Sequence, residues 1–135
     1  MGRVYFNARR ESHALDGAYT VTAADSGKVF MLSATGGTVA ITLPTTLVEG
    51  LYYKFIVLED TPANAITIAA GGTNKVDLVM KDIGGDASNS TAGTQVSNII
   101  IGTATKQGDY IDMFHDGTSW YAECMSSTNN SITTS

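Results

Sequence analysis

The sequence predicts an all-β sandwich or barrel of eight or nine strands. Short apolar runs alternate with turn residues at intervals of about ten residues, the spacing typical of such folds. The composition favours Thr, Val, Ile, Ala, Ser and Gly, which suits short strands joined by tight turns. No window repeats apolar residues at the i, i+3, i+4, i+7 spacing of an amphipathic helix over three turns. Helices are therefore expected to contribute little.

The first four expected strands each follow a turn signal. Residues 18–22 follow the dipeptide DG, 28–32 follow DSG, 38–43 follow GG and 51–58 follow EG. The run 51–58 (LYYKFIVL) is the longest, so we expect it in the centre of a sheet, buried on both faces along part of its length. The run 38–43 alternates strictly, which places on one face Val39, Ile41 and Leu43.

Five more strands are expected in the second half of the chain. Residues 65–69 follow the turn DTPAN, 75–80 follow a GG pair, and 98–104 end before KQGD. Residues 110–115 (YIDMFH) and 119–124 (SWYAEC) flank a DG turn dipeptide and are expected to form a terminal hairpin. The apolar face of the second hairpin strand should pack in the core through Trp120, Ala122 and Cys124.

One domain accounts for residues 1–135. We expect an extended arm over 1–17, the sandwich over 18–125 and a polar tail over 126–135. The stretch 84–97 (GGDASNSTAGTQVS) is small, polar and contains Gly, so it is expected to form a long surface loop.

Composition argues against several classes of function. The only cysteine, Cys124, permits no internal disulfide and no Cys/His zinc site, and neither a metal nor a cofactor is expected. The net charge of −5 is unfavourable for general nucleic-acid binding. No apolar run reaches the ~20 residues of a membrane helix, and residues 1–12 lack the apolar run of a secretory signal. We therefore expect a protein made in a reducing cytoplasm, with neither nucleic acid nor a membrane as its partner.

The stretch HDGTSWY (115–121) contains the residue types of a hydrolytic triad, His115, Asp116 and Ser119. A triad must bring nucleophile, base and acid to one point. Asp116 lies on the expected turn itself, and no glycine elbow surrounds Ser119. We therefore interpret the stretch as a hairpin turn, and we expect His115→Ala to leave stability and binding nearly unchanged.

Other chemistry is only weakly indicated. Four acids near the terminal hairpin could pair for glycosidic cleavage, but we favour solvated positions on strands and turns. Four tyrosines could line a sugar-binding face, but such residues more often pack in or beside the core. The acids are Asp109, Asp112, Asp116 and Glu123, and the tyrosines are Tyr52, Tyr53, Tyr110 and Tyr121. Cys124 alternates with apolar positions, which indicates an inert buried thiol.

Four segments resemble, in the same order, a module of tailed-phage structural proteins. They are TAADSGKVFMLSATGGTVAITLP (22–44), GLYYKFIV (50–57), GDASNSTAG (85–93) and GDYIDMFHDGTSWYAEC (108–124). Such modules occur in head decoration (cement) proteins and in fibres or spikes. The resemblance covers about residues 20–124 and implies an antiparallel jelly-roll sandwich.

The resemblance implies a structural protein of the virion and not an enzyme. A chain without a coiled coil or fibre shaft is more similar to a decoration protein than to a fibre fragment. We expect it to bind the major capsid protein on the outer surface of a phage head and to stabilise the shell, as a homodimer or homotrimer. The alternative is a receptor- or carbohydrate-binding module of a tail fibre or spike. A third candidate is a glycan-cleaving enzyme that uses the acids of the terminal hairpin.

The N-terminal arm is basic, whereas the rest of the chain is acidic. Three consecutive apolar residues are unusual for a disordered terminus, and arginines suit an acidic patch on another chain. The candidate partner-binding residues are Arg3, Val4, Tyr5, Phe6, Arg9 and Arg10. We expect the arm to anchor the protein by adding a strand to a capsid-protein sheet, or else to form a strand of its own sandwich or a dimer contact.

Overall fold

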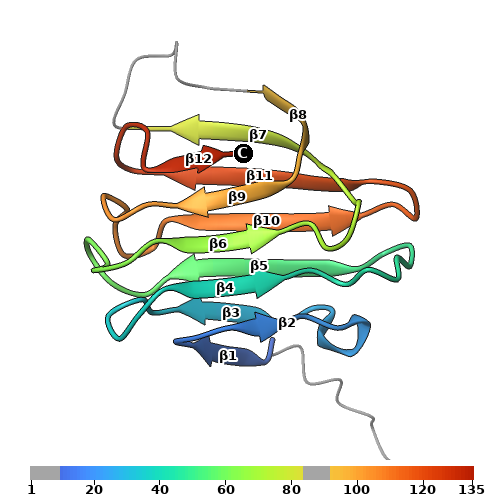
Figure 1. The fold of residues 1–135 in the computed structure, drawn as a ribbon, viewed down its shortest axis with the longest axis horizontal. Helices are drawn as coiled ribbons and strands as arrows, with labels where there is room; N and C mark the ends of the chain where they lie inside the picture. The colour runs from blue at the N-terminus through green and yellow to red at the C-terminus, as the bar shows by residue number, and fades with distance from the viewer. Residues whose placement is uncertain (1–9, 84–91) are drawn as a thin grey trace, which may run out of the picture.

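Two β-sheets pack face to face in the structure, a computed structural model that describes residues 10–83 and 92–135 (Figure 1). Across sheet A lie, in spatial order, β1 (Ser12–Leu15), β3 (Val29–Leu32), β5 (Tyr52–Val57), β10 (Tyr110–His115), β11 (Trp120–Ser126), β7 (Val76–Asp82) and β8 (Ala92–Val96). Across sheet B lie β12 (Ile132–Thr134), β9 (Asn98–Ile101), β6 (Ile66–Ala69), β4 (Val39–Thr42) and β2 (Tyr19–Thr20). A short 3₁₀ helix, η1 (Ala23–Asp25), follows β2. The expected all-β sandwich is confirmed.

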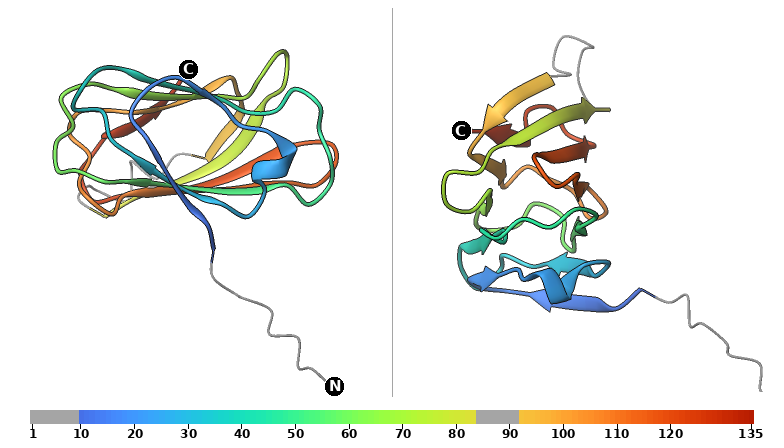
Figure 2. Two further views of the ribbon diagram at one scale, coloured as in Figure 1. Left: turned by 90° about the horizontal axis from the view of Figure 1, so that it is seen from below. Right: turned by 90° about the vertical axis from the view of Figure 1, so that its right-hand side faces the viewer.

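The chain winds back and forth between the two sheets (Figure 2). From β1 to β7 the odd-numbered strands belong to sheet A and the even-numbered strands to sheet B. A strand that returns to its sheet after such a crossing keeps its direction, so β1, β3 and β5 pair in parallel, as do β2, β4 and β6. Of ten strand pairs in the described residues, only five show the expected antiparallel pairing. The sheets are therefore mixed, and a jelly-roll arrangement is not confirmed.

The hairpin formed by β10 and β11 lies in the middle of sheet A. β10 pairs antiparallel with β5, and β11 pairs parallel with β7, so the hairpin joins the two halves of the sheet. This arrangement confirms the turn at 115–121 and the central position of the run 51–58. Burial alternates strictly along β5, however, so only one face of that strand lies in the core.

The core lies between the sheets and is filled by the inward-facing residues of both. On the sheet A side, Phe30 stacks on Phe55 with 5.2 Å between ring centroids, and Tyr53 packs against Trp120 at 5.7 Å. The expected inward face of β11 is confirmed, because Trp120, Ala122 and Cys124 are all buried. Sheet B and its flanking residues contribute branched aliphatic side chains, among them Val39, Ile41, Leu43, Ile66, Ile68, Ile99 and Ile101.

Three strands lie where the sequence predicts none. β1 falls within the expected arm (1–17), β8 within the expected loop (84–97) and β12 within the expected tail (126–135). All three are edge strands. An edge strand is held by hydrogen bonds to a single neighbour and can be short and polar, so its own sequence carries little strand signal.

His115 is fully buried at the end of β10, so the structure predicts a loss of stability for His115→Ala instead of the neutral effect expected from the sequence. Its ring packs edge-on against Trp120, with 4.8 Å between ring centroids, and its Nδ1 accepts the Gly117 backbone N–H at 3.0 Å. From the sequence alone, the position of His115 beside a turn suggests that its side chain is exposed. The alternation of β10 instead continues to its last residue and turns His115 inward.

Trp120→Ala and His115→Ala should both destabilise the fold. The first removes a fully buried indole and should lower the free energy of unfolding by about 3–5 kcal/mol. The second leaves a smaller cavity and removes the acceptor of the Gly117 N–H, which should lower the free energy of unfolding by about 1–3 kcal/mol. Denaturant unfolding of the two variants measures both losses. A His115→Ala midpoint equal to that of the wild type would show that the ring does not support the core.

Candidate interaction surface

The stretch 115–121 forms a hydrogen-bonded turn and not a triad. Asp116 Oδ1 accepts the backbone N–H groups of Thr118 and Ser119, both at 2.8 Å, while His115 Nδ1 accepts that of Gly117. These bonds direct the carboxylate and the imidazole to the turn backbone instead of to each other. The backbone hydrogen bonds from Ser119 and Thr118 also hold the pKa of Asp116 below its usual value.

The thiol and the acids expected as alternatives occupy separate places. Burial raises the pKa of the Cys124 thiol to about 12, with a further contribution from the charge of Glu123, so the thiol stays protonated at neutral pH. Asp109 precedes β10 and Asp116 follows it, so the four acids do not form one cluster. Within the described ranges, no three His, Cys, Asp or Glu side chains form a group suited to a metal ion. No helix in those ranges has the length and apolar character to cross a membrane.

A row of aromatic side chains crosses the outer face of sheet A. The strand register places Tyr52 of β5 beside Phe114 of β10, and Phe114 beside Tyr121 of β11. The next position across the sheet is Asp77 of β7. These side chains point outward because the residues on either side of them in each strand fill the core. Phe114 and Tyr121 are each 45% exposed. We call Tyr52, Phe114 and Tyr121 the aromatic row.

The aromatic row lines an open groove of about 540 Å³. Val79 adds a further apolar side chain that is 49% exposed. Asp77, Asp112 and Glu123 give the groove an acidic lining. The groove is therefore apolar along its centre and negatively charged beside it. Exposed apolar patches with a polar rim are typical of interaction sites.

Two of the groove acids already have cationic neighbours. Asp112 accepts the Tyr52 hydroxyl at 2.8 Å and Lys54 Nζ at 3.2 Å. Glu123 forms a longer ion pair of 3.7 Å with Lys81. Asp112 and Glu123 are also cross-strand partners. These contacts hold the carboxylates in place beside the aromatic row, where they can accept hydrogen bonds or attract a cation.

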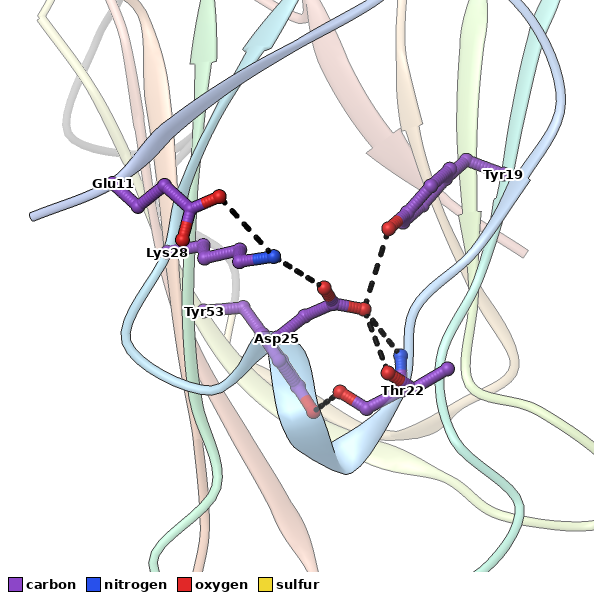
Figure 3. Close-up of polar contacts among 6 residues, drawn as sticks. All are labelled: Glu11, Tyr19, Thr22, Asp25, Lys28 and Tyr53. Carbon is purple, nitrogen blue, oxygen red and sulfur yellow. Dashed lines mark hydrogen bonds and ion pairs between the residues drawn. The ribbon is translucent and has the colours of Figure 1, made fainter.

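A cluster of polar side chains around the buried Asp25 fixes the adjoining edge of sheet A (Figure 3). Asp25 Oδ2 accepts the Thr22 N–H at 2.9 Å and the Thr22 hydroxyl at 2.8 Å, and Oδ1 accepts Lys28 Nζ at 2.9 Å. Tyr19 donates to the same carboxylate at 3.3 Å, and Lys28 lies 3.5 Å from Glu11 Oε1. We call these five residues the Asp25 cluster. It links the chain before β1, strand β2, helix η1 and the start of β3.

The Asp25 cluster also positions the first residue of the aromatic row. Tyr53 of β5 donates its hydroxyl to the Thr22 carbonyl at 2.8 Å, and the Gly27 N–H donates to the Tyr52 carbonyl at 2.7 Å. Gly27 has a φ of +89°, a backbone conformation that favours glycine. The segment 22–28 thus has a structural role here.

Arg10 extends the aromatic row toward β1. Strand pairing aligns Ser12 with Val29 and Val29 with Lys54. The residues two positions earlier in each segment therefore lie at one level of the sheet, and they are Arg10, Gly27 and Tyr52. Gly27 has no side chain, and the Arg10 guanidinium carbon lies 4.8 Å from the centroid of the Tyr52 ring. The other partner-binding candidates lie outside the described residues; they are Arg3, Val4, Tyr5, Phe6 and Arg9.

The sequence identified part of this surface. Of the four candidate tyrosines, Tyr53 is buried in the core, whereas the others alternate outward on sheet A. The sequence patterns did not identify Phe114 or Val79 as part of the surface. The alternation of inward and outward residues along the strand could have identified Phe114 as outward-facing, because Met113 and His115 on either side of it both face the core.

The outer face of sheet B has a different character. None of its five strands carries a charged residue, and small or branched uncharged side chains cover it. The two faces of the sandwich are therefore distinct, and charge and aromatic groups gather on sheet A. Comparisons of the chain with protein-family models, with curated proteins and with solved structures give no match.

Asp25→Asn should destabilise the fold and remove a pH dependence. Burial alone would raise the pKa of Asp25, but the hydrogen bonds from Lys28 and Thr22 outweigh it and lower the pKa to about 2. In the unfolded chain the pKa is about 4, so the folded state gains stability that is complete above pH 4 and is lost as the pH falls toward 2. A difference of about two pKa units corresponds to about 2–3 kcal/mol.

Unfolding free energies of the wild type and of Asp25→Asn, measured from pH 2 to pH 6, test this account. The difference between the two proteins should shrink below pH 4. Asp16→Asn, a change of an exposed acid outside the cluster, is the matched control and should follow the wild type throughout. Parallel curves for the wild type and Asp25→Asn would contradict the assigned role of the carboxylate.

Proposed function

We propose that the protein is a capsid decoration protein that binds the outer surface of a tailed-phage head through the outer face of sheet A. The observation that carries the proposal is the aromatic row in an acidic groove of sheet A, where Phe114 and Tyr121 are each 45% exposed. Exposed aromatic rings beside polar groups are typical of the centres of protein interfaces. The resemblance of the segments 22–44, 50–57, 85–93 and 108–124 to phage structural modules supports the choice of partner.

The mechanism is adhesion. A decoration protein that touches two subunits of the major capsid protein binds only while they stay together, so binding stabilises the assembled shell by mass action. A homodimer or homotrimer of the chain would bind symmetry-related sites with a raised effective concentration. The acidic groove disfavours nucleic acid as its ligand. The chain would be made in the host cytoplasm and act on the virion without catalysis, metal or cofactor.

A receptor- or carbohydrate-binding module of a tail fibre or spike is the second candidate. It is favoured by the same aromatic row, because sugar rings stack on aromatic side chains while neighbouring carboxylates accept their hydroxyl hydrogen bonds. Asp112 and Glu123 lie two residues along their strands from Phe114 and Tyr121, at the next outward-facing position. The two candidates differ in the partner that the groove recognises: a protein shell or a glycan on the host surface.

Co-sedimentation separates the two candidates. The purified chain should sediment with undecorated heads of the phage that encodes it and not with host cells. Phe114→Ser and Tyr121→Ser should each weaken head binding by at least about tenfold, because truncation of a central interface aromatic commonly costs 1–2 kcal/mol or more. Ile83→Ser changes an exposed apolar residue outside the groove and should bind as the wild type does.

Binding to cells and not to heads would replace decoration by the receptor-binding function. Head binding that neither groove variant weakens, with both variants folded, would show that sheet A is not the contact surface.

A further inference from the structure

One acid of the groove has no cationic partner among the described residues. The other two groove acids each form an ion pair with a lysine. Asp77 accepts hydrogen bonds of 3.0–3.5 Å from Gln95, but no ion pair to it is found in residues 10–83 and 92–135. Because the donors of Gln95 are neutral, the charge of the carboxylate is not compensated. A negative charge thus remains at the end of the aromatic row.

Asp77 lies beside an exposed aromatic ring. Its cross-strand partner is Tyr121, one strand spacing or about 4.8 Å away, and Tyr121 is 45% exposed. Glu123 is the next outward residue of β11, about 7 Å along the strand. The charge of Asp116 raises the pKa of the Tyr121 hydroxyl, and the charge of Asp77 contributes to the shift. The Tyr121 side chain therefore lies in the field of several carboxylates.

The same face already holds a cation between an aromatic ring and an acid. Lys54 Nζ lies 4.2 Å from the centroid of the Tyr110 ring and 3.2 Å from Asp112 Oδ2. This ring and this acid are two residues apart on β10. On β11 the same spacing separates Tyr121 from Glu123. β11 therefore presents a second ring and acid at the spacing that binds the Lys54 ammonium.

The second ring is open to a cation from another molecule. The Arg10 guanidinium carbon lies 4.8 Å from the centroid of the Tyr52 ring, whereas no arginine or lysine in the described part of the chain lies over the Tyr121 ring. Arginine suits this place better than lysine, because a planar guanidinium can stack on a ring and donate two hydrogen bonds to a carboxylate.

The surface around Tyr121 is apolar. Phe114 beside it is 45% exposed, and Val79 of β7 is 49% exposed. In an extended segment the side chains at positions i and i+2 share a face and lie about 7 Å apart. Apolar residues two positions before and after an arginine would therefore reach this surface while the arginine lies over Tyr121.

We propose that the end of the groove at Tyr121 and Asp77 binds an arginine side chain of a partner protein. The guanidinium stacks on the Tyr121 ring and pairs with the Asp77 carboxylate, and apolar neighbours of the arginine cover Phe114 and Val79. A neutral glycan would leave the charge of Asp77 uncompensated. Only the identification of the partner as the major capsid protein rests on the proposed function.

A model peptide tests the site in the full-length protein without phage heads. The probe is acetyl-Leu-Gly-Arg-Gly-Leu-amide, and its control carries citrulline, a neutral isostere, in place of arginine. In NMR titrations at low salt, the arginine peptide should shift the backbone amide signals of Asp77, Phe114 and Tyr121. The citrulline peptide should bind at least about fivefold more weakly, because it lacks the charge that the ring and the carboxylate recognise.

Two matched variants locate the charge that the peptide recognises. Asp77→Asn keeps an oxygen that can accept the Gln95 N–H, and it should weaken binding of the arginine peptide at least about fivefold. Asp60→Asn changes an exposed acid outside the groove that also accepts a backbone N–H, from Gln107 at 2.9 Å. It should bind the peptide as the wild type does. Unchanged amide spectra away from the substitution show that both variants are folded.

Equal binding of the arginine and citrulline peptides, or no binding of either, would overturn the site. Equal binding of the arginine peptide by the wild type and Asp77→Asn would also overturn it. Groove signals that shift with an oligosaccharide from the host surface, but with neither peptide, would make the groove a glycan site instead.

Co-sedimentation with phage heads separates this site from the proposed function. If Phe114→Ser and Tyr121→Ser lose head binding while Asp77→Asn keeps it, the decoration function stands and the arginine site is overturned. If the wild type binds the arginine peptide selectively but does not sediment with heads, the arginine site stands and the decoration function is overturned.

Discussion

The register of the β10–β11 hairpin between β5 and β7 determines both the core and the outer surface of sheet A. Side chains alternate between the two faces of a strand, so burial of Met113 and Trp120 forces Phe114 and Tyr121 outward. A slip of one residue would bury Asp112 and expose the core residues, which makes any other register strongly unfavourable. The aromatic row is thus held in place by the energy of the hydrophobic core.

Polar interactions hold the ends of several strands of sheet A. The Asp25 cluster joins the start of the fold to β3 and β5, and Asp109 holds the other end of β10 by accepting the Ser127 N–H at 2.9 Å. Each such charged hydrogen bond contributes about 1.5–3 kcal/mol, comparable to one buried aliphatic side chain. Buried acids such as Asp25 and Asp109 therefore serve the fold, whereas the acids of the groove lie on the outer face of sheet A.

Local patterns in the sequence were enough to predict the class of fold, the central strand 51–58, the terminal hairpin and the inward face of β11. They could not distinguish parallel from antiparallel pairing, because both require the same alternation of side chains. Edge strands such as β12 depend on a neighbour and left no local signal. The burial of His115 and the exposure of Phe114 follow from the alternation of the expected strand 110–115, whose bounds match β10, but the neighbouring turn suggested an exposed histidine. The groove combines the β10–β11 hairpin with β5 and β7, two strands that are distant from it in sequence, so composition alone could suggest its tyrosines but not their arrangement.

The central claim is that the outer face of sheet A is the surface with which the protein binds a phage head. A cryo-electron-microscopy reconstruction of heads saturated with the purified chain tests it most directly. The account predicts density for the sandwich on the outer surface of the shell, with β5, β10, β11 and β7 facing the capsid protein and Phe114 and Tyr121 at the contact. Density in which the charge-free face of sheet B meets the shell, or heads that remain undecorated at saturating protein, would contradict it.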